Sequence, residues 1–268
     1  MNVAKAAFSA VPPKLAGERV FSEFLRGASG GSLPEIVSWA EGTPAQIRAM
    51  LDAWKNGLID ITENWSVGEK RSIHHNAITT EWGGEAQAAG DHEWAIIDFN
   101  TADHGVYVAM TDWLPSSGVM NNSATNEGSW RDCIRRTFAN GVFRESLSDD
   151  PVYSLFKPMN VITGVCNSDE LITTQDYFAL FAENEVYGKY DGNYSPYRYG
   201  KHHTNSENNA LTRFSYYANE DNIPNCEFWF RSPDDDDTDD FAAQSSSNQS
   251  TSHISYSNYW LVFFGYIS

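Results

Sequence analysis

Apolar positions near the start of the chain recur with the period of a helix. After Thr43, four apolar side chains stand at i, i+3, i+4 and i+7: Ile47, Met50, Leu51 and Trp54. This pattern predicts an amphipathic helix that begins at Thr43-Pro44 and is stopped by Gly57. A shorter helix is predicted just ahead of it, because Ser32 can cap a first turn that contains Pro34.

From Leu58 onward the period changes to that of strands. Four runs are separated by glycine and polar turns: Ile59–Ile61, Trp65–Val67, His92–Phe99 and Val106–Val108. Two more strands are predicted near the C-terminus, at Cys226–Arg231 and at Trp260–Ile267. We expect these strands to pair antiparallel, with helices inserted between them, which defines an α+β fold.

Two inserted helices are predicted. The apolar face of the first carries Trp130, Cys133, Ile134 and Phe138, and its other faces carry Arg131, Arg135 and Arg136. This helix follows Gly128-Ser129 and is predicted to end at Asn140-Gly141. The second is predicted to begin at Thr173 or Thr174, with Tyr177, Phe178 and Phe181 packing inward. The polar stretch between them and the C-terminal strands, Tyr187 to Asn209, is predicted to be a long surface loop.

Residues 1–31 are rich in Ala, Gly and Ser and end in Gly30-Gly31, so we interpret them as an arm or attachment segment. Residues 32–268 then form the main domain. No apolar run reaches the ~20 residues of a membrane span, and the first thirty residues lack the apolar core of a secretory signal. We expect synthesis in the cytoplasm without a signal peptide; work outside the cell would require release by lysis or within an assembly.

The net charge of the chain limits the classes of partner that it is expected to bind. The chain has 18 Lys and Arg against 36 Asp and Glu, a formal charge of −18. Nucleic acid and anionic membrane surfaces both require clustered basic residues, so neither is an expected partner. The chain is nonetheless 41% hydrophobic and 14% aromatic, which predicts a folded domain with a large aromatic core.

Motifs that carry chemistry are scarce. The adjacent pairs His74-His75 and His202-His203 lack the i, i+4 spacing of a zinc helix, and no nucleophile elbow or phosphate-binding loop occurs. The three cysteines are far apart in the sequence and are interpreted as reduced thiols. Paired carboxylates for glycoside hydrolysis remain an alternative, although no constellation singles out two of the 36 acids. We expect a protein that is not an enzyme.

The acid is concentrated near the C-terminus. Six aspartates fall within seven positions: Asp234, Asp235, Asp236, Asp237, Asp239 and Asp240. An EF-hand loop would need glycine at its sixth position, where Asp239 stands, and a glutamate at its twelfth. We therefore expect no cofactor, with a calcium ion as the alternative to a solvated loop.

The composition of residues 234–260 indicates a binding surface. Asp and Ser fill 13 of these 27 positions, aromatic residues are interspersed, and Lys, Arg, Glu, Gly, Met and Pro do not occur. A polar loop held between two rigid strands suits recognition. Most of its residues can be reached from an Asn codon by changing adenines alone, although Gln244, Gln249 and Trp260 cannot. Adenine-directed diversification and chance composition both account for this bias.

Several motifs, in order along the chain, resemble an uncharacterised domain family of phages and Firmicute prophages. They are Val67-Gly68-Glu69, Gly128-Ser129-Trp130 with Arg135, Thr174-x-Asp176, Glu185-Val186-Tyr187-Gly188, Phe228-Trp229-Phe230-Arg231-Ser232-Pro233, and the terminal Val262-Phe263-Phe264-Gly265-Tyr266-Ile267. The resemblance covers roughly residues 32–268. Phe228 departs from the family's usual Trp, and Ser268 follows the strand where the family usually ends.

That family is similar to the C-type-lectin-like variable proteins of diversity-generating retroelements. The resemblance implies a C-type-lectin-like fold that serves receptor binding, with four scaffold residues: Trp130, Trp229, Arg231 and Pro233. Arg231 is expected to hold a buried carboxylate or backbone carbonyls. The implied ligand contacts are Asp234, Asp235, Asp236, Asp237, Asp239, Asp240, Ser245, Ser246, Ser247, His253, Tyr256 and Tyr259.

The resemblance implies a phage or prophage protein, on a virion tail or at the cell exterior, that binds a host-cell surface protein or glycan. A homo-oligomer or contacts with other virion proteins would fit this role. Two alternatives belong to other classes. One is a carbohydrate-active enzyme or a calcium-dependent glycan-binding accessory domain. The other is a structural virion component whose acidic loop is only solvated.

Overall fold

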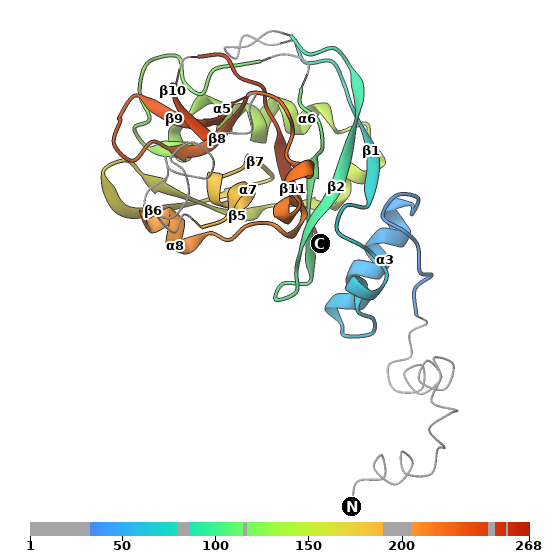
Figure 1. The fold of residues 1–268 in the computed structure, drawn as a ribbon. Coiled ribbons are helices and arrows are strands. Elements are labelled where there is room, and N and C mark those ends of the chain that lie inside the picture. Colours follow the sequence, from blue (N-terminus) through green and yellow to red (C-terminus); the bar gives the residue numbers. More distant parts are fainter. Residues whose placement is uncertain (1–32, 80–85, 115–116, 190–204, 246–249, 256) are drawn as a thin grey trace, which may run out of the picture.

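The computed structural model describes residues 33–79, 86–114, 117–189, 205–245, 250–255 and 257–268. The arm predicted for residues 1–31 lies outside these ranges, as does most of the loop predicted between Tyr187 and Asn209. The described chain is a mixed α+β structure in which antiparallel strands form a curled sheet and the helices are short (Figure 1).

The main sheet has six strands. They are β1 (Lys70–His75), β2 (Gly90–Asn100), β3 (Gly105–Met110), β11 (Phe263–Ile267), β4 (Phe156–Lys157) and β7 (Phe178–Leu180). The C-terminal strand β11 lies inside the sheet, with β3 on one side and both β4 and β7 on the other. Gly265 makes this possible, because a Cβ there would meet the rings of Phe178 and Phe156 at 2.8 and 3.0 Å.

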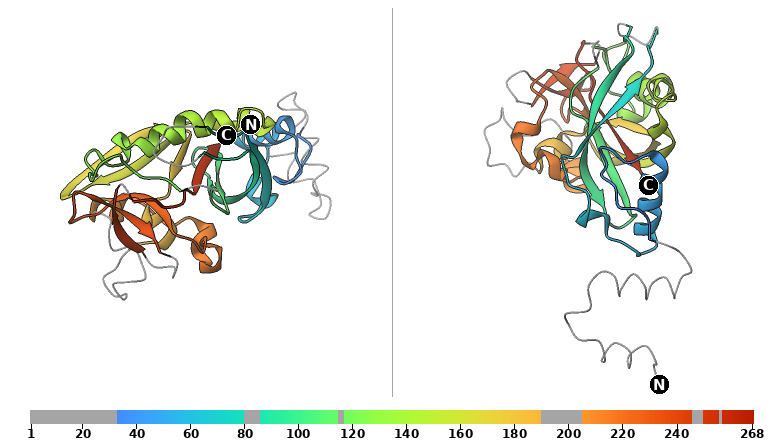
Figure 2. Two further views of the ribbon diagram at one scale, coloured as in Figure 1. Left: turned by 90° about the horizontal axis from the view of Figure 1, so that it is seen from above. Right: turned by 90° about the vertical axis from the view of Figure 1, so that its right-hand side faces the viewer.

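Two smaller sheets complete the strands. One is the hairpin of β5 (Met159–Val165) and β6 (Ser168–Asp176). The other has the order β10-β9-β8, from β8 (Phe228–Pro233), β9 (Asp240–Gln244) and β10 (Ser250–Ile254). This three-stranded sheet lies at the end of the molecule away from helix α3 (Pro44–Lys55), as Figures 1 and 2 both show.

The remaining helices are single turns or short runs. The α-helices are α4 (Ser129–Asp132), α5 (Ile134–Phe138), α6 (Arg144–Ser146), α7 (Glu183–Tyr187) and α8 (Asn205–Ala210). A π-turn, η2 (Ala139–Phe143), joins α5 to α6. The 3₁₀ turns are η1 (Ile61–Glu63), η3 (Pro151–Leu155), η4 (Ser215–Ala218) and η5 (Glu220–Asn222).

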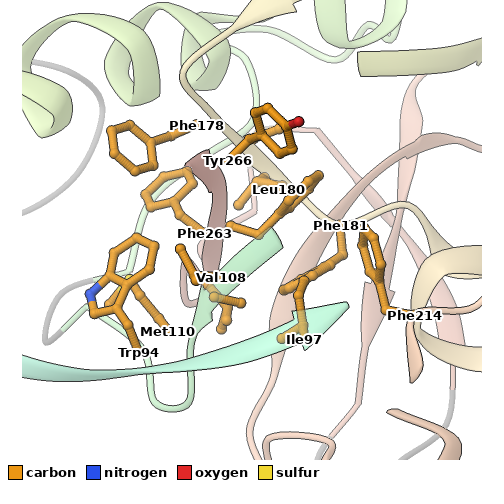
Figure 3. Close-up of a cluster of buried hydrophobic side chains, with 14 of the residues drawn as sticks. Trp94, Ile97, Val108, Met110, Phe178, Leu180, Phe181, Phe214, Phe263 and Tyr266 are labelled. Atoms are coloured by element: carbon orange, nitrogen blue, oxygen red, sulfur yellow. The ribbon is translucent and has the colours of Figure 1, made fainter. Parts of the chain in front are cut away.

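Aromatic side chains from separate strands fill the core. Figure 3 shows Trp94 of β2, Phe178 of β7 and Phe263 of β11 pointing toward one another. Phe143 links them, with its ring 4.5 Å from that of Phe263 and 5.4 Å from that of Phe178. Burying each such ring stabilises the fold by about 1.5–3 kcal/mol relative to leaving it exposed. The many aromatic residues of the sequence therefore serve to pack the core.

The helix predicted from Thr43-Pro44 is confirmed. Thr43 and Gln46 form a reciprocal capping box, and the four predicted apolar residues are buried. The helix predicted from Ser32 and Pro34 is wrong over the described residues, because residues 33–43 contain turns and irregular chain. There Trp39 is fully buried and its Nε1 donates to the carbonyl of Trp94, so tertiary packing outweighs local propensity.

Two of the four strands predicted between Ile59 and Val108 are confirmed. The predicted runs at His92–Phe99 and Val106–Val108 lie within β2 and β3. Those at Ile59–Ile61 and Trp65–Val67 are wrong, because Asp60 caps a 3₁₀ turn and the following residues form turns.

The helix predicted after Gly128-Ser129 is present as two short helices, α4 and α5, because Cys133 between them has an extended conformation, and the helical run does not end at Asn140-Gly141. The chain passes through the π-turn instead, and the Asn140 side chain supports it by donating to the carbonyls of Arg136 and Phe178. Arg135, predicted on a polar face, is buried. The helix predicted from Thr173 or Thr174 is wrong, because residues 168–176 form β6, with Ile172, Thr174 and Asp176 buried on alternate positions.

Candidate ligand-binding surface

Strand β8 carries a buried arginine that uses its whole guanidinium. The two Nη atoms of Arg231 donate to the carboxylate of Glu185 at 2.5 and 2.7 Å. They also reach the carbonyls of Leu180 at 2.7 Å and Ile162 at 3.1 Å, and Nε donates to Ile162 as well. Arg231 is 1% exposed. The carboxylate expected beside Arg231 is therefore that of Glu185, and this arginine joins β8 to β5, β7 and α7.

The next residue on the strand extends the buried network. The hydroxyl of Ser232 donates to the carboxylate of Glu207 and accepts the backbone N–H of Glu183. The other carboxylate oxygen of Glu207 accepts the N–H of Gly164 at 2.8 Å. Two buried carboxylates, one from α7 and one from α8, thus fix the position of β8.

A third buried carboxylate fixes the β5–β6 hairpin. Asp176 accepts a hydrogen bond from Trp130 Nε1 at 2.9 Å and from Arg136 Nε at 2.7 Å. Beside it, the hydroxyl of Ser129 donates to the carbonyl of Gly164 at 2.6 Å. Residues of four motifs that carry the family resemblance, widely separated in sequence, therefore meet in one buried polar network.

Gly118 supports the other end of β8. Its carbonyl accepts Trp229 Nε1 at 2.8 Å, and its backbone pairs with that of Tyr259. Arg135 Nε and Nη2 donate to the carbonyl of Val119, and a Cβ at Gly118 would lie 2.8 Å from Cζ of Arg135. Burial lowers the pKa of Arg135 to about 10. Only glycine fits here without displacing the buried guanidinium.

Five of the six aspartates lie in the turn between β8 and β9, the sixth, Asp240, begins β9, and Asp234 organises the turn. Asp234 is 6% exposed, and its Oδ1 accepts the N–H groups of Asp236 and Asp237 at 2.9 and 3.2 Å. Oδ1 of Asp237 accepts the N–H of Asp239 at 2.9 Å. Such side-chain turns hold the backbone locally. Asp234, predicted as a ligand contact, is thus placed as a buried anchor of the turn.

Distant segments hold the backbone of the turn. Asn126 Nδ2 donates to the carbonyls of Asp237 and Asp240 at 2.7 and 2.8 Å. The N–H of Asn167 donates to the carbonyl of Asp235, and that of Ser255 to the carbonyl of Asp239. These partners bind carbonyl oxygens, which every residue type provides. The path of the turn is therefore fixed largely without reference to its side chains.

The remaining carboxylates face outward. Asp236, Asp237 and Asp239 are exposed, and Asp235 and Asp240 are partly exposed. A hollow of about 300 Å³ beside the turn is lined by Asn167, Ser168, Asp169, Asp235 and Asp236. Another of about 370 Å³ is lined by Thr125, Asn126, Glu127, Gly128, Val165, Cys166, Thr238 and Asp239. The turn is negatively charged and contributes residues to the lining of both hollows.

Aromatic side chains gather near the start of β8. The Tyr259 ring lies 4.8 Å from that of Trp229 and 4.6 Å from that of His253. Trp260 packs against Trp113 with 6.3 Å between ring centroids, and both are half-buried. Burial raises the pKa of Tyr259 to about 12, so its hydroxyl stays protonated and can donate. Trp113 had no distinguishing pattern in the sequence.

The predicted contacts thus fall into two groups. Trp229 and Pro233 stand four residues apart on β8, about 13 Å at the rise of a strand, so the acidic turn and the aromatic group lie at its two ends. Ser245 is partly exposed at the end of β9. Ser246, Ser247 and Tyr256 lie outside the described residues. Segment 234–260, expected as one loop, contains the strands β9 and β10.

A hollow of about 930 Å³ lies away from every predicted contact and is lined by residues of the β2–β3 turn, of β5 and of the chain after α8. Its carboxylates already serve internal contacts. Asp98 accepts from Ser215, Asp103 accepts from Asn100, and Glu185 is paired with Arg231. The exposed acids of the turn are better placed for a ligand than these.

The described residues offer neither a cluster of metal-binding side chains nor a membrane-spanning helix. No group of three or more His, Cys, Asp or Glu side chains lies close enough there to hold a metal ion. Likewise, none of the described helices has the length and apolar character needed to cross a membrane.

The three cysteines are free thiols. Burial raises the pKa values of Cys133 and Cys226 to about 12, which keeps both protonated and weakly nucleophilic. The pKa of the partly buried Cys166 is also raised, again chiefly by burial. The thiols therefore lack the activated thiolate that nucleophilic catalysis needs.

No family model, curated protein or solved structure matches the chain.

Proposed function

We propose that this is a ligand-recognition protein whose contact surface is the turn after β8 together with the aromatic group near Tyr259. In this proposal it is a phage- or prophage-encoded receptor-binding protein that binds a host-cell surface protein or glycan. Its scaffold is C-type-lectin-like, and segment 234–260 is diversified by a retroelement. The chemistry required is binding alone.

One observation carries the proposal. The backbone of residues 234–239 is fixed by Asn126, Asn167 and Ser255, while the carboxylates of Asp236, Asp237 and Asp239 point to solvent. Exposed side chains of such a turn can be exchanged without moving its backbone, except at Asp237, whose Oδ1 accepts the N–H of Asp239. Pre-organisation of the path also lowers the entropy lost on binding.

The binding test uses a variant that keeps the turn. Replacing Asp236, Asp237 and Asp239 by Asn removes three charges but retains the oxygen that accepts the N–H of Asp239. Binding of the labelled protein to bacterial cells of the source strain is measured by flow cytometry. We expect at least a tenfold loss of affinity, because contacts of ionised groups contribute about 1.5–3 kcal/mol each.

A matched control separates local contact from net charge. Asp52→Asn, Glu63→Gln and Asp221→Asn together remove the same three charges from exposed positions elsewhere. This control is expected to bind as the wild type does. Equal binding by the turn variant, or equal losses in both proteins, would remove the turn from the contact surface.

The coding DNA tests diversification separately. A reverse transcriptase gene nearby, with a near-copy of the 3′ end that differs at adenines, is expected. An unchanged segment 234–260 across sister isolates, without such genes, would refute diversification and leave recognition standing.

A further inference from the structure

Two buried histidines on neighbouring strands face each other. His75 of β1 pairs with Gly90 and His92 of β2 pairs with Ile73, which places the two imidazoles on the same face of the main sheet. Their Nε2 atoms lie 3.1 Å apart, and the residues are 1% and 7% exposed. That distance is a hydrogen bond, so one Nε2 must carry a proton and the other must accept it.

The opposite ring nitrogens also have fixed partners. Nδ1 of His75 lies 2.9 Å from the carbonyl oxygen of Asn76, and Nδ1 of His92 lies 2.9 Å from Oδ1 of Asp112. A carbonyl oxygen and an ionised carboxylate only accept hydrogen bonds. Both Nδ1 atoms must therefore be protonated for these contacts to form.

The number of N–H groups that these contacts require shows that the histidine pair is charged. The three contacts require three N–H groups, whereas two neutral imidazoles supply two. We propose that His75, His92 and Asp112 form a buried proton-binding site in which the histidine pair carries one extra proton, balanced by the Asp112 carboxylate. This site acts as a pH-sensitive lock between β1, β2 and the end of β3.

The groups around the pair favour one added proton. His74 lies 2.7 Å from Asp91, on the strands of the pair itself. From the segment after α6, Asp149 accepts from Asn76 and Asp150 accepts from the backbone of His74. Of these groups, Asp91 raises the pKa of His75 and His74 lowers it, while the Asp112 carboxylate lies directly against His92 and favours a single added proton there. Near Asp112, Cys226 is a neutral thiol, because burial raises its pKa to about 12.

A second added proton is disfavoured. Burial lowers the pKa of His75, the carbonyl of Asn76 opposes this, and the neighbouring His92 lowers it further. Nδ1 of His92 faces the Asp112 carboxylate, whereas Nδ1 of His75 faces a neutral carbonyl, so the geometry places the extra proton on His92 and leaves Nε2 of His75 as the acceptor. The folded pair takes up one extra proton where the unfolded chain is largely neutral, so its contribution to stability is lost as the pH rises. At acidic pH the unfolded chain binds two, and stability falls again.

Loss of the extra proton would break one of three contacts. The pair lies at the end of the β1–β2 ladder. Beyond it, Ile78 and Gln87 form an isolated antiparallel bridge between the segments that continue the two strands. Asp112 directly precedes Trp113, which packs on Trp260. The lock thus holds an edge of the main sheet, and its existence does not depend on the proposed ligand recognition.

Nuclear magnetic resonance of the full chain, labelled with ¹⁵N at histidine, tests the assignment. At pH 7 the imidazole ¹⁵N shifts are expected to show His75 neutral with its proton on Nδ1 and His92 protonated on both nitrogens. A neutral His92 at pH 7 would overturn the proposal. So would stoichiometric zinc in the purified protein whose removal by chelation separates the two rings, because a metal ion would then bridge the nitrogens.

Unfolding by denaturant across pH 6 to 9 gives a second measurement. The wild type is expected to take up close to one proton on folding above about pH 7.5, where free histidines with a pKa of about 6.5 are mostly neutral, seen as the slope of stability against pH. His92→Gln and Asp112→Asn should abolish that slope, whereas His74→Gln, beside the pair but half-exposed, should keep it. The same slope in all four proteins would contradict the lock even if each variant is less stable.

Discussion

Strand β8 leads from a set of buried carboxylates to a set of exposed ones, and the two sets are held in opposite ways. Behind the strand, Glu185 and Glu207 bind side chains and backbone of distant segments, with Arg231 and Ser232 as specific partners. In the turn that follows, Asp236 and Asp239 face solvent, while distant partners bind the carbonyls of the turn.

The difference separates positions by their tolerance to substitution. A buried carboxylate requires specific donors, such as the guanidinium of Arg231 for Glu185 or the hydroxyl of Ser232 for Glu207, so neither residue of such a pair can change alone. An exposed residue in a turn fixed through its carbonyls can change freely. The predictions below test whether the sensitive and tolerant positions divide between the buried network and the turn.

The largest effect is expected at Arg231. Arg231→Met leaves the buried Glu185 without its cation and should lower the free energy of unfolding by about 3–5 kcal/mol. Urea denaturation at pH 7 measures it. Adding Glu185→Gln to Arg231→Met should recover part of the loss, since no buried charge then remains uncompensated. A double variant no more stable than the single one would show that the ion pair is not the source of the effect.

The next effect concerns packing against the second buried arginine. Gly118→Ala places a Cβ against the guanidinium of Arg135 and should cost about 1–3 kcal/mol, measured as a shift in the urea midpoint. Gly141→Ala is the matched control, because a Cβ there meets nothing within 4 Å. Its stability should stay equal or rise slightly. Equal effects of the two substitutions would contradict the close approach at Gly118.

A smaller loss is expected at the edge of the network. Trp130→Phe removes the Nε1–H that Asp176 accepts and leaves a partial cavity, at a cost of about 2 kcal/mol. Trp113→Phe, at a half-buried position, should lower the free energy of unfolding by less than half as much. Thermal unfolding followed by circular dichroism compares the two, and the reverse order would place Trp130 outside the scaffold.

Sequence patterns predicted elements whose burial is apolar. Helix α3 and strand β2 follow directly from the spacing of their apolar residues. Strand β1, which reads Lys-Arg-Ser-Ile-His-His, has no such pattern, because the pairing of His75 with His92 replaces apolar burial. Strand β6 was mistaken for a helix because its buried positions include Thr174 and Asp176, which are polar.

The sequence predicts which types of residue form the site, but not which residues pair with one another. The resemblance implies that Arg231 holds a buried carboxylate or backbone carbonyls, and the fold provides both, with Glu185 as the carboxylate among 36 acids. The acidic run is visible at once, whereas the burial of Asp234 depends on the turn it forms. Asn126 and Asn167 carry no signal in the sequence, since both donate to backbone carbonyls of a distant turn, Asn126 through its side chain and Asn167 through its backbone N–H.

The smallest effect on stability is expected in the acidic turn itself, and it is the sharpest test of the comparison. Asp236→Ala removes an exposed side chain and should change the free energy of unfolding by less than about 0.5 kcal/mol. Asp234→Ala, two residues away, removes the oxygen that accepts the N–H groups of Asp236 and Asp237, and should cost about 1 kcal/mol. Urea titrations of both measure the pair. Because both variants lose one negative charge from the same turn, relief of repulsion is common to them, and a difference reports the anchoring role of Asp234. Equal changes in the free energy of unfolding would mean that Asp234 anchors the turn no more than Asp236 does.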